Sequence, residues 1–82
     1  MGNEQDKYFK DFFAEKDSID DEFIVVDSKG QTHVFDKDQV LVEILAMPND
    51  IKKKIRNKFV IIDFKRGDIN HFINYMLKGL VK

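Results

Sequence analysis

The sequence predicts a small α+β domain in which helices pack on one face of a three-stranded, mainly antiparallel sheet. Two runs of β-favouring residues flank a turn that contains Gly30, and a third β-branched run spans residues 59–64. Apolar residues recur at helical spacing near both ends of the chain. The predicted order is helix, hairpin, helix, helix, strand, helix. We expect one domain over residues 1–82, with an acidic amino-terminal helix and linker over 1–22 and the core over 23–82.

The composition favours one compact core inside the cell. Of the 82 residues 43% are hydrophobic, and eight Phe and two Tyr supply large apolar areas. There is no Cys, which excludes disulfides and thiolate metal sites and favours the cytoplasm. No export signal is visible at the amino end, and no apolar run approaches the roughly 18 residues of a membrane span. The sequence therefore predicts a cytoplasmic protein with no membrane partner.

The first predicted element is a helix over residues 3–16. Its aromatic residues fall at positions i, i+1, i+4 and i+5 and form one stripe: Tyr8, Phe9, Phe12 and Phe13. If the helix folds back, these rings complete the core of the chain. If it projects, they form a contact surface for another protein or a second copy. The acidic segment Asp17–Glu22 is the predicted connection to the next element.

A β-hairpin follows, with strands Phe23–Val26 and Thr32–Phe35. The turn is Asp27-Ser28-Lys29-Gly30, in which Gly30 takes the left-handed conformation. His33 is opposite in phase to Thr32 and Val34, and we expect no special role for it.

Asp36 followed by Gln39 resembles a capping box and predicts a helix that starts there and runs to about Met47, although the β-branched content of the segment also allows a strand. Pro48-Asn49-Asp50 breaks the chain and starts another helix. In that helix the predicted apolar ridge is formed by Ile51, Ile55 and Phe59.

Residues 59–64 (FVIIDF) have the β-branched content of a third strand, although helical spacing also allows the preceding helix to continue to Ile62. Arg66-Gly67 is a predicted turn, and Asp68 is the predicted cap of the last helix. The core side of that helix is formed by Ile69, Phe72, Ile73, Met76, Leu77 and Leu80.

The charges are unevenly distributed along the chain. Residues 1–22 carry a net charge of −5, residues 23–50 of −3 and residues 51–82 of +7. This polarity can attract an acidic partner, hold the acidic helix near the basic part of the chain, or pair two copies head to tail.

The basic residues cluster in one helix, at Lys52, Lys53, Lys54, Arg56 and Lys58. These five are the candidate nucleic-acid contacts, in an arrangement that resembles a helix-turn-helix. Four of the five are Lys, the helix opens with the acidic Asp50, and the chain as a whole is slightly acidic. A solvated face is therefore the favoured interpretation.

The remaining patterns give little support for catalysis. Asp63-Phe64-Lys65 resembles the D-x-K of the PD-(D/E)xK nucleases, in which the acid binds Mg²⁺ and the Lys steadies the attacking water or the scissile phosphate. The Pro-Asp pair of that family is interrupted here as Pro48-Asn49-Asp50. The only histidines, His33 and His71, lack the spacing of a zinc site, and no phosphate-binding loop or catalytic triad pattern is present.

These observations predict a small non-catalytic protein-binding or regulatory module with no cofactor and no metal. Its expected partner is an unidentified protein or a second copy of itself, bound through Tyr8, Phe9, Phe12 and Phe13. Nucleic-acid binding through the basic helix is the alternative, and a metal-dependent nuclease is a remote one.

Overall fold

A computed structural model describes residues 4–15, 19–65 and 68–81, and of residues 63–65 it describes the backbone only. Four helices and a two-stranded antiparallel sheet follow one another along the chain, which confirms the α+β class. Their bounds are α1 Glu4–Glu15, β1 Glu22–Val26, β2 Thr32–Asp36, α2 Lys37–Leu45, α3 Asn49–Lys65 and α4 Ile69–Leu80. The predicted turn at Arg66-Gly67 and the start of the predicted linker, through Ser18, lie outside the described residues.

The hairpin forms as the sequence predicts. β1 and β2 pair so that Phe23 lies opposite Phe35 and Ile24 opposite Val34. Gly30 has a φ of 84°, a left-handed conformation that glycine adopts without steric cost, and its N–H donates to the carbonyl of Asp27. The side chains of β1 alternate, with Phe23 and Val25 buried.

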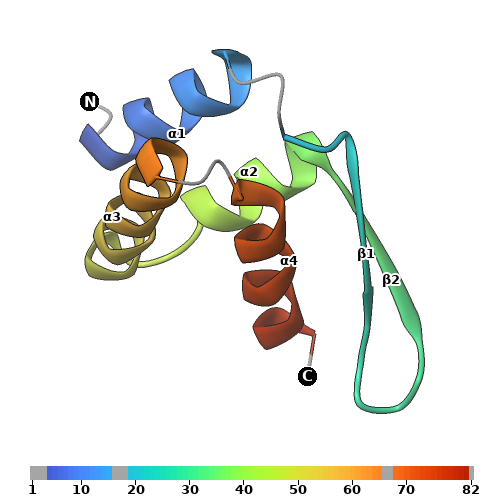
Figure 1. Cartoon of the computed structure of the whole chain (residues 1–82). Helices are drawn as coiled ribbons and strands as arrows, with labels where there is room; N and C mark the ends of the chain where they lie inside the picture. The colour runs from blue at the N-terminus through green and yellow to red at the C-terminus, as the bar shows by residue number, and fades with distance from the viewer. Residues whose placement is uncertain (1–3, 16–18, 66–67, 82) are drawn as a thin grey trace.

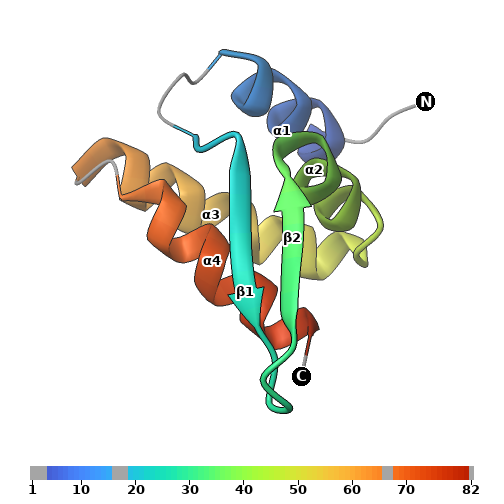
Figure 2. The same cartoon turned by 90° about the vertical axis from the view of Figure 1, so that its right-hand side faces the viewer.

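The helices lie to one side of the hairpin, as Figure 1 shows, and Figure 2 looks onto the opposite, uncovered face. α4 packs against β1, α2 follows β2 directly, and α1 contacts both α2 and α3. The sheet is therefore covered on one face only.

The helix starts are confirmed in part. Asp36 is the N-cap of α2, where its Oδ1 accepts a hydrogen bond from the backbone N–H of Gln39 at 2.7 Å. Asp68 occupies the N-cap position of α4 but makes no side-chain capping bond. α4 buries Ile69, Ile73 and Leu77 and partly buries Phe72 and Met76, as its spacing predicts, but Leu80, the last predicted core residue, is 45% exposed.

The predicted third strand is wrong, because residues 59–64 continue helix α3. This continuation places Phe59 on the same side of the helix as Ile55, and both side chains are buried. Packing of the Phe59 ring thus outweighs the β-propensity of the neighbouring Val60 and Ile61, whose side chains remain about half exposed. Within the described residues the sheet has two strands, and the alternative of a continued helix is correct.

Phe59 is the centre of the hydrophobic core. Its ring lies 5.3 Å from that of Phe9, 5.1 Å from Phe12, 6.3 Å from Phe13 and 5.7 Å from Phe72, measured between centroids. Three helices therefore meet at one aromatic cluster. In the part of the chain that the structure describes, no helix combines the length and the apolar character needed to cross a bilayer.

Candidate functional site

The aromatic stripe of α1 is part of the core. Phe9, Phe12 and Phe13 are buried against Phe59, so α1 folds back onto the rest of the chain. Tyr8 is partly buried, and its ring lies 5.6 Å beneath the guanidinium of Arg56. The first of the two predicted arrangements is the one observed, and the three phenylalanines are not available as a surface for a partner.

Two of the five candidate nucleic-acid contacts point toward α1. Lys52 is only 6% exposed, and its Nζ donates to Asp6 Oδ1 at 2.6 Å and to the carbonyl of Leu45 at 3.4 Å. Nη1 of Arg56 donates to Gln5 Oε1 at 2.8 Å. The acidic amino-terminal part is thereby held against the basic helix, one of the predicted consequences of the charge asymmetry.

The predicted apolar ridge of α3 needs a correction. Ile51 is 37% exposed, whereas Lys52 occupies the buried face together with Ile55 and Phe59. Positions i, i+3 and i+7 share a helix face just as i, i+4 and i+8 do, so spacing alone did not separate the two arrangements. Ile51 was predicted to be buried because it is apolar. Burial of the Lys52 ammonium requires a charged partner, and no local pattern identifies Asp6 as that partner.

Of the five candidate nucleic-acid contacts, Lys53, Lys54 and Lys58 remain exposed. They are spread over the exposed circumference of α3, whereas Lys52 and Arg56 contact α1. The exposed set is smaller than the five-residue site that the sequence suggests.

The nuclease resemblance loses its structural basis. The family motif needs a strand, on which residues two apart share a face, but residues 63–65 lie in α3. The side chains of Asp63 and Lys65 are outside the described part. Among the described residues, no group of three or more His, Asp or Glu side chains is arranged to hold a metal ion.

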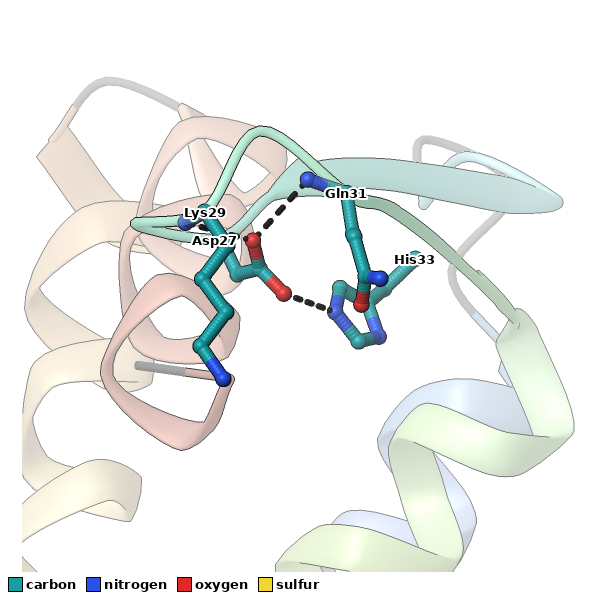
Figure 3. A network of polar contacts seen from close by, with 4 residues as sticks. All are labelled: Asp27, Lys29, Gln31 and His33. Carbon is teal, nitrogen blue, oxygen red and sulfur yellow. Dashed lines mark hydrogen bonds and ion pairs between the residues drawn. The ribbon is translucent and has the colours of Figure 1, made fainter.

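A polar network at the turn of the hairpin was not predicted. Figure 3 shows Asp27 at its centre: Oδ1 accepts from the backbone N–H groups of Lys29 and Gln31 at 2.8 and 2.9 Å, and Oδ2 lies 2.9 Å from Nε2 of His33. The hydrogen bond from His33, followed by that from Gln31, lowers the pKa of Asp27 below its usual 3.8. Asp27 and His33 share a sheet face diagonally across the strand pair, as the observed register places them.

The uncovered face of the hairpin carries a small apolar surface, here called the hairpin patch: Ile24, Val26 and Val34. Their side chains are 58%, 55% and 51% exposed. Ile24 and Val34 are directly opposed across the strands. A solvent-facing sheet surface is usually polar, so three exposed β-branched apolar residues on one short hairpin mark a candidate contact surface.

A groove of about 530 Å³ adjoins the hairpin patch, between β1 and the polar face of α4. His71, Asn74, Tyr75 and Lys78 line it, from the side of α4 opposite to its buried residues. The opposite wall comes from the start of β1 and the residues before it: Asp20, Glu22, Phe23 and Ile24, with Asn70 also contributing from α4. We call this the β1–α4 groove.

Two asparagines fasten the walls of the β1–α4 groove together. Asn70 Oδ1 accepts from the backbone N–H of Asp20 at 2.9 Å, and Asn74 Nδ2 donates to the carbonyl of Ile24 at 3.2 Å. The groove is therefore a defined feature of the fold, with its amides held at known positions.

Comparisons of the chain with protein-family models, with curated proteins and with solved structures find no match.

Proposed function

We propose that this chain is a small, non-catalytic protein-binding module whose contact surface is the hairpin patch and the adjoining β1–α4 groove. The observation that carries the proposal is the exposure of Ile24, Val26 and Val34 on the uncovered face of a two-stranded sheet. An isolated pair of strands is marginally stable, and here the helices support only one face. A partner that covers the other face would bury apolar area that the chain itself leaves in water.

The surroundings of the hairpin patch indicate the character of the partner. Glu22 and Asp36 are directly opposed at one end of the patch and are both exposed. Like charges at adjacent positions repel each other, and a cation from a partner would relieve that repulsion. A fitting surface is therefore apolar at its centre and basic at one border. The lack of cysteine supports action in the reducing cytoplasm, as part of the same proposal.

The experiment is affinity capture from a nuclease-treated lysate of the source organism, with three immobilised chains. These are the unaltered chain, the double variant Ile24→Thr/Val34→Thr and the control Ile61→Thr. Threonine keeps the β-branched shape in the hairpin while it removes apolar area. Ile61 is 50% exposed on α3, so the control makes the same chemical change at a distant site.

We expect proteins that are retained by the unaltered chain and by the control but lost from the double variant. Circular dichroism of all three chains checks that the fold is kept. An identical set of retained proteins on the three chains would contradict the proposal.

Nucleic-acid binding is a second candidate function, and it rests on the exposed side chains of Lys53, Lys54 and Lys58. Three neighbouring cations attract phosphates without reading a base sequence. We place it second because Lys52 and Arg56 are already engaged with α1.

A further inference from the structure

The outer edge of β1 presents backbone groups to a further strand. In an antiparallel pair, residues that exchange hydrogen bonds alternate with residues whose N–H and C=O point away from the partner strand. Lys37 N–H donates to the Asp21 carbonyl, and Asp27 N–H donates to the Gln31 carbonyl, both at 2.9 Å. Asp21 and Asp27 are therefore positions that bond to the neighbouring strand. By the same alternation Phe23 and Val25, which lie between Asp21 and Asp27, also exchange hydrogen bonds with β2.

It follows that the backbone groups of Glu22, Ile24 and Val26 point outward from the hairpin, along the β1–α4 groove. An independent contact agrees with this, because the carbonyl of Ile24 accepts its hydrogen bond from Asn74 of α4 and not from β2. That carbonyl has a second lone pair, so one further donor can bind it.

The charges along the groove have a fixed order. Asn70 contacts Asp20 and Asn74 contacts Ile24, so α4 runs in the same direction as β1, as Figure 2 also shows. Lys78 lies one turn beyond Asn74 on the same face of α4. The groove therefore has two acids, Asp20 and Glu22, at one end and Lys78 at the other.

Between its charged ends the groove also has exposed apolar area. Ile24 is 58% exposed and Tyr75 is 76% exposed, and both line the groove. No ion pair between the described residues joins Lys78 to Asp20 or to Glu22 within the chain. The opposite charges are thus separated by the length of the groove and are both available to an outside surface.

We propose that the occupant of this groove is a second copy of the same chain, bound in antiparallel orientation with its β1 beside the first β1. The inference rests on the proposed function and names the occupant of the groove part of its contact surface, while the hairpin patch of each copy stays on the open face of the joined sheet. A twofold axis near Ile24 places Ile24 of each copy opposite its equivalent and Glu22 opposite Val26. It also brings Lys78 of each copy to the acids at the far end of the other groove, so the charge pattern is complementary to itself.

The pairing joins two hairpins into one four-stranded antiparallel sheet. Its new hydrogen bonds use the outward backbone groups of β1, which β2 does not use. The equivalent edge of β2 offers no such charge match. There a twofold axis at Val34 would set Thr32 opposite Asp36, with no cation facing the acid.

A charge exchange tests the proposal by sedimentation velocity on the intact chain. The first variant is Lys78→Glu, and the second is Asp20→Lys/Glu22→Lys. Each variant alone places like charges at both ends of an antiparallel pair. A mixture of the two in equal amounts restores opposite charges at both ends.

We expect the unaltered chain to sediment as a dimer at high concentration, each variant alone to dimerise at least about tenfold more weakly, and the mixture to recover dimers. Ile24→Pro should also prevent dimerisation, because it removes an outward N–H that β2 does not use. Val34→Pro makes the same change on the outer edge of β2 and should leave dimerisation intact. Circular dichroism identifies any variant that does not fold.

The inference is overturned if the unaltered chain stays monomeric, if the single-charge variants dimerise like it, or if the mixture fails to recover. A monomeric chain that still loses its captured proteins in the Ile24→Thr/Val34→Thr variant would overturn self-pairing and support the proposed function with another partner. An unaltered chain that stays monomeric, and whose captured proteins are also the same for the Ile24→Thr/Val34→Thr variant, would overturn both the self-pairing and the proposed function.

Discussion

Lys52 Nζ and Asp6 Oδ1 lie 2.6 Å apart and connect helix α3 to helix α1 across 46 residues of sequence. The lysine is almost completely buried, whereas the side chain of Asp6 is 27% exposed. The contact is thus asymmetric. The buried ammonium would be costly without the carboxylate, whereas the carboxylate can still be solvated by water without the ammonium.

The asymmetry leads to different expectations for the two partners. Asp6→Ala leaves a buried charge without its carboxylate and should lower the free energy of unfolding by about 1–3 kcal/mol. Lys52→Met removes the buried charge while filling its space and should cost less than about 1 kcal/mol. Urea unfolding measures both, with the exposed Lys53→Met as control. Equal losses for Asp6→Ala and Lys52→Met would contradict the asymmetry.

Phe59 should be the most sensitive position of the core. Phe59→Ala removes the ring that contacts aromatic residues of α1 and α4, with an expected loss of about 3–5 kcal/mol in the free energy of unfolding. Phe59→Leu keeps an apolar side chain and should cost about 1.5 kcal/mol. Thermal and urea unfolding measure these changes. The neighbouring Val60→Ala should stay within about 0.5 kcal/mol, and a loss there as large as that of Phe59→Ala would argue that the helix faces are wrongly assigned.

The Asp27 network should make the hairpin sensitive to acid. Because the pKa of Asp27 is lower in the folded chain than its usual 3.8, the ionised carboxylate stabilises the fold above that value. This stabilisation is lost as the pH falls through the lower, folded pKa. Asp27→Asn should therefore be less stable than the unaltered chain near neutral pH and should match it at the acid end of the titration.

The measurement is urea unfolding of both chains between about pH 2 and pH 7, together with the amide NMR shifts of Lys29 and Gln31, which report directly on the Asp27 carboxylate. His33→Ala should raise the midpoint of those shifts toward 3.8, because His33 is the main cause of the lowered pKa. A constant difference in stability at every pH would speak against the network.

Nucleic-acid binding has a quantitative test in its salt dependence. If binding uses Lys53, Lys54 and Lys58, the exposed three of the five candidate contacts, the plot of log affinity for duplex DNA against log salt concentration should have a slope of about −2.7. Gel shifts at several salt concentrations give this slope, and Lys53→Glu/Lys54→Glu should abolish any binding. A slope near −4.5 would mean that Lys52 and Arg56 leave α1 to bind phosphates.

The sequence predicts those parts of the fold in which local chemistry decides. Gly30 in its turn, Asp36 at its helix start and the repeating apolar residues of α4 need no distant partner to be recognised. The segment around Phe59 is different, because its β-branched residues favour a strand while a cluster of rings from two other helices favours a helix. The choice between strand and helix is decided by tertiary packing around Phe59, and the local sequence does not show which distant residues will pack there.

In the candidate site, too, some features can be predicted from the local sequence and others depend on distant contacts. The polar side of α4 follows from helical spacing, but its position beside β1 depends on Asn70 and Asn74 reaching backbone groups far away in the sequence. The hairpin patch could have been predicted from alternation alone, since Ile24 and Val26 are out of phase with the buried Phe23 and Val25. What the alternation could not show is that none of the described helices, α1 to α4, covers that face.

The ring cluster around Phe59 also bears on how the chain is made. Phe9 and Phe72 both contact Phe59, and they lie near opposite ends of the printed sequence. A ribosome must therefore have synthesised nearly all of these residues before the core can close. Until then, the phenylalanines of the first helix emerge without their partners, and nascent chains would expose them to chaperones and to one another.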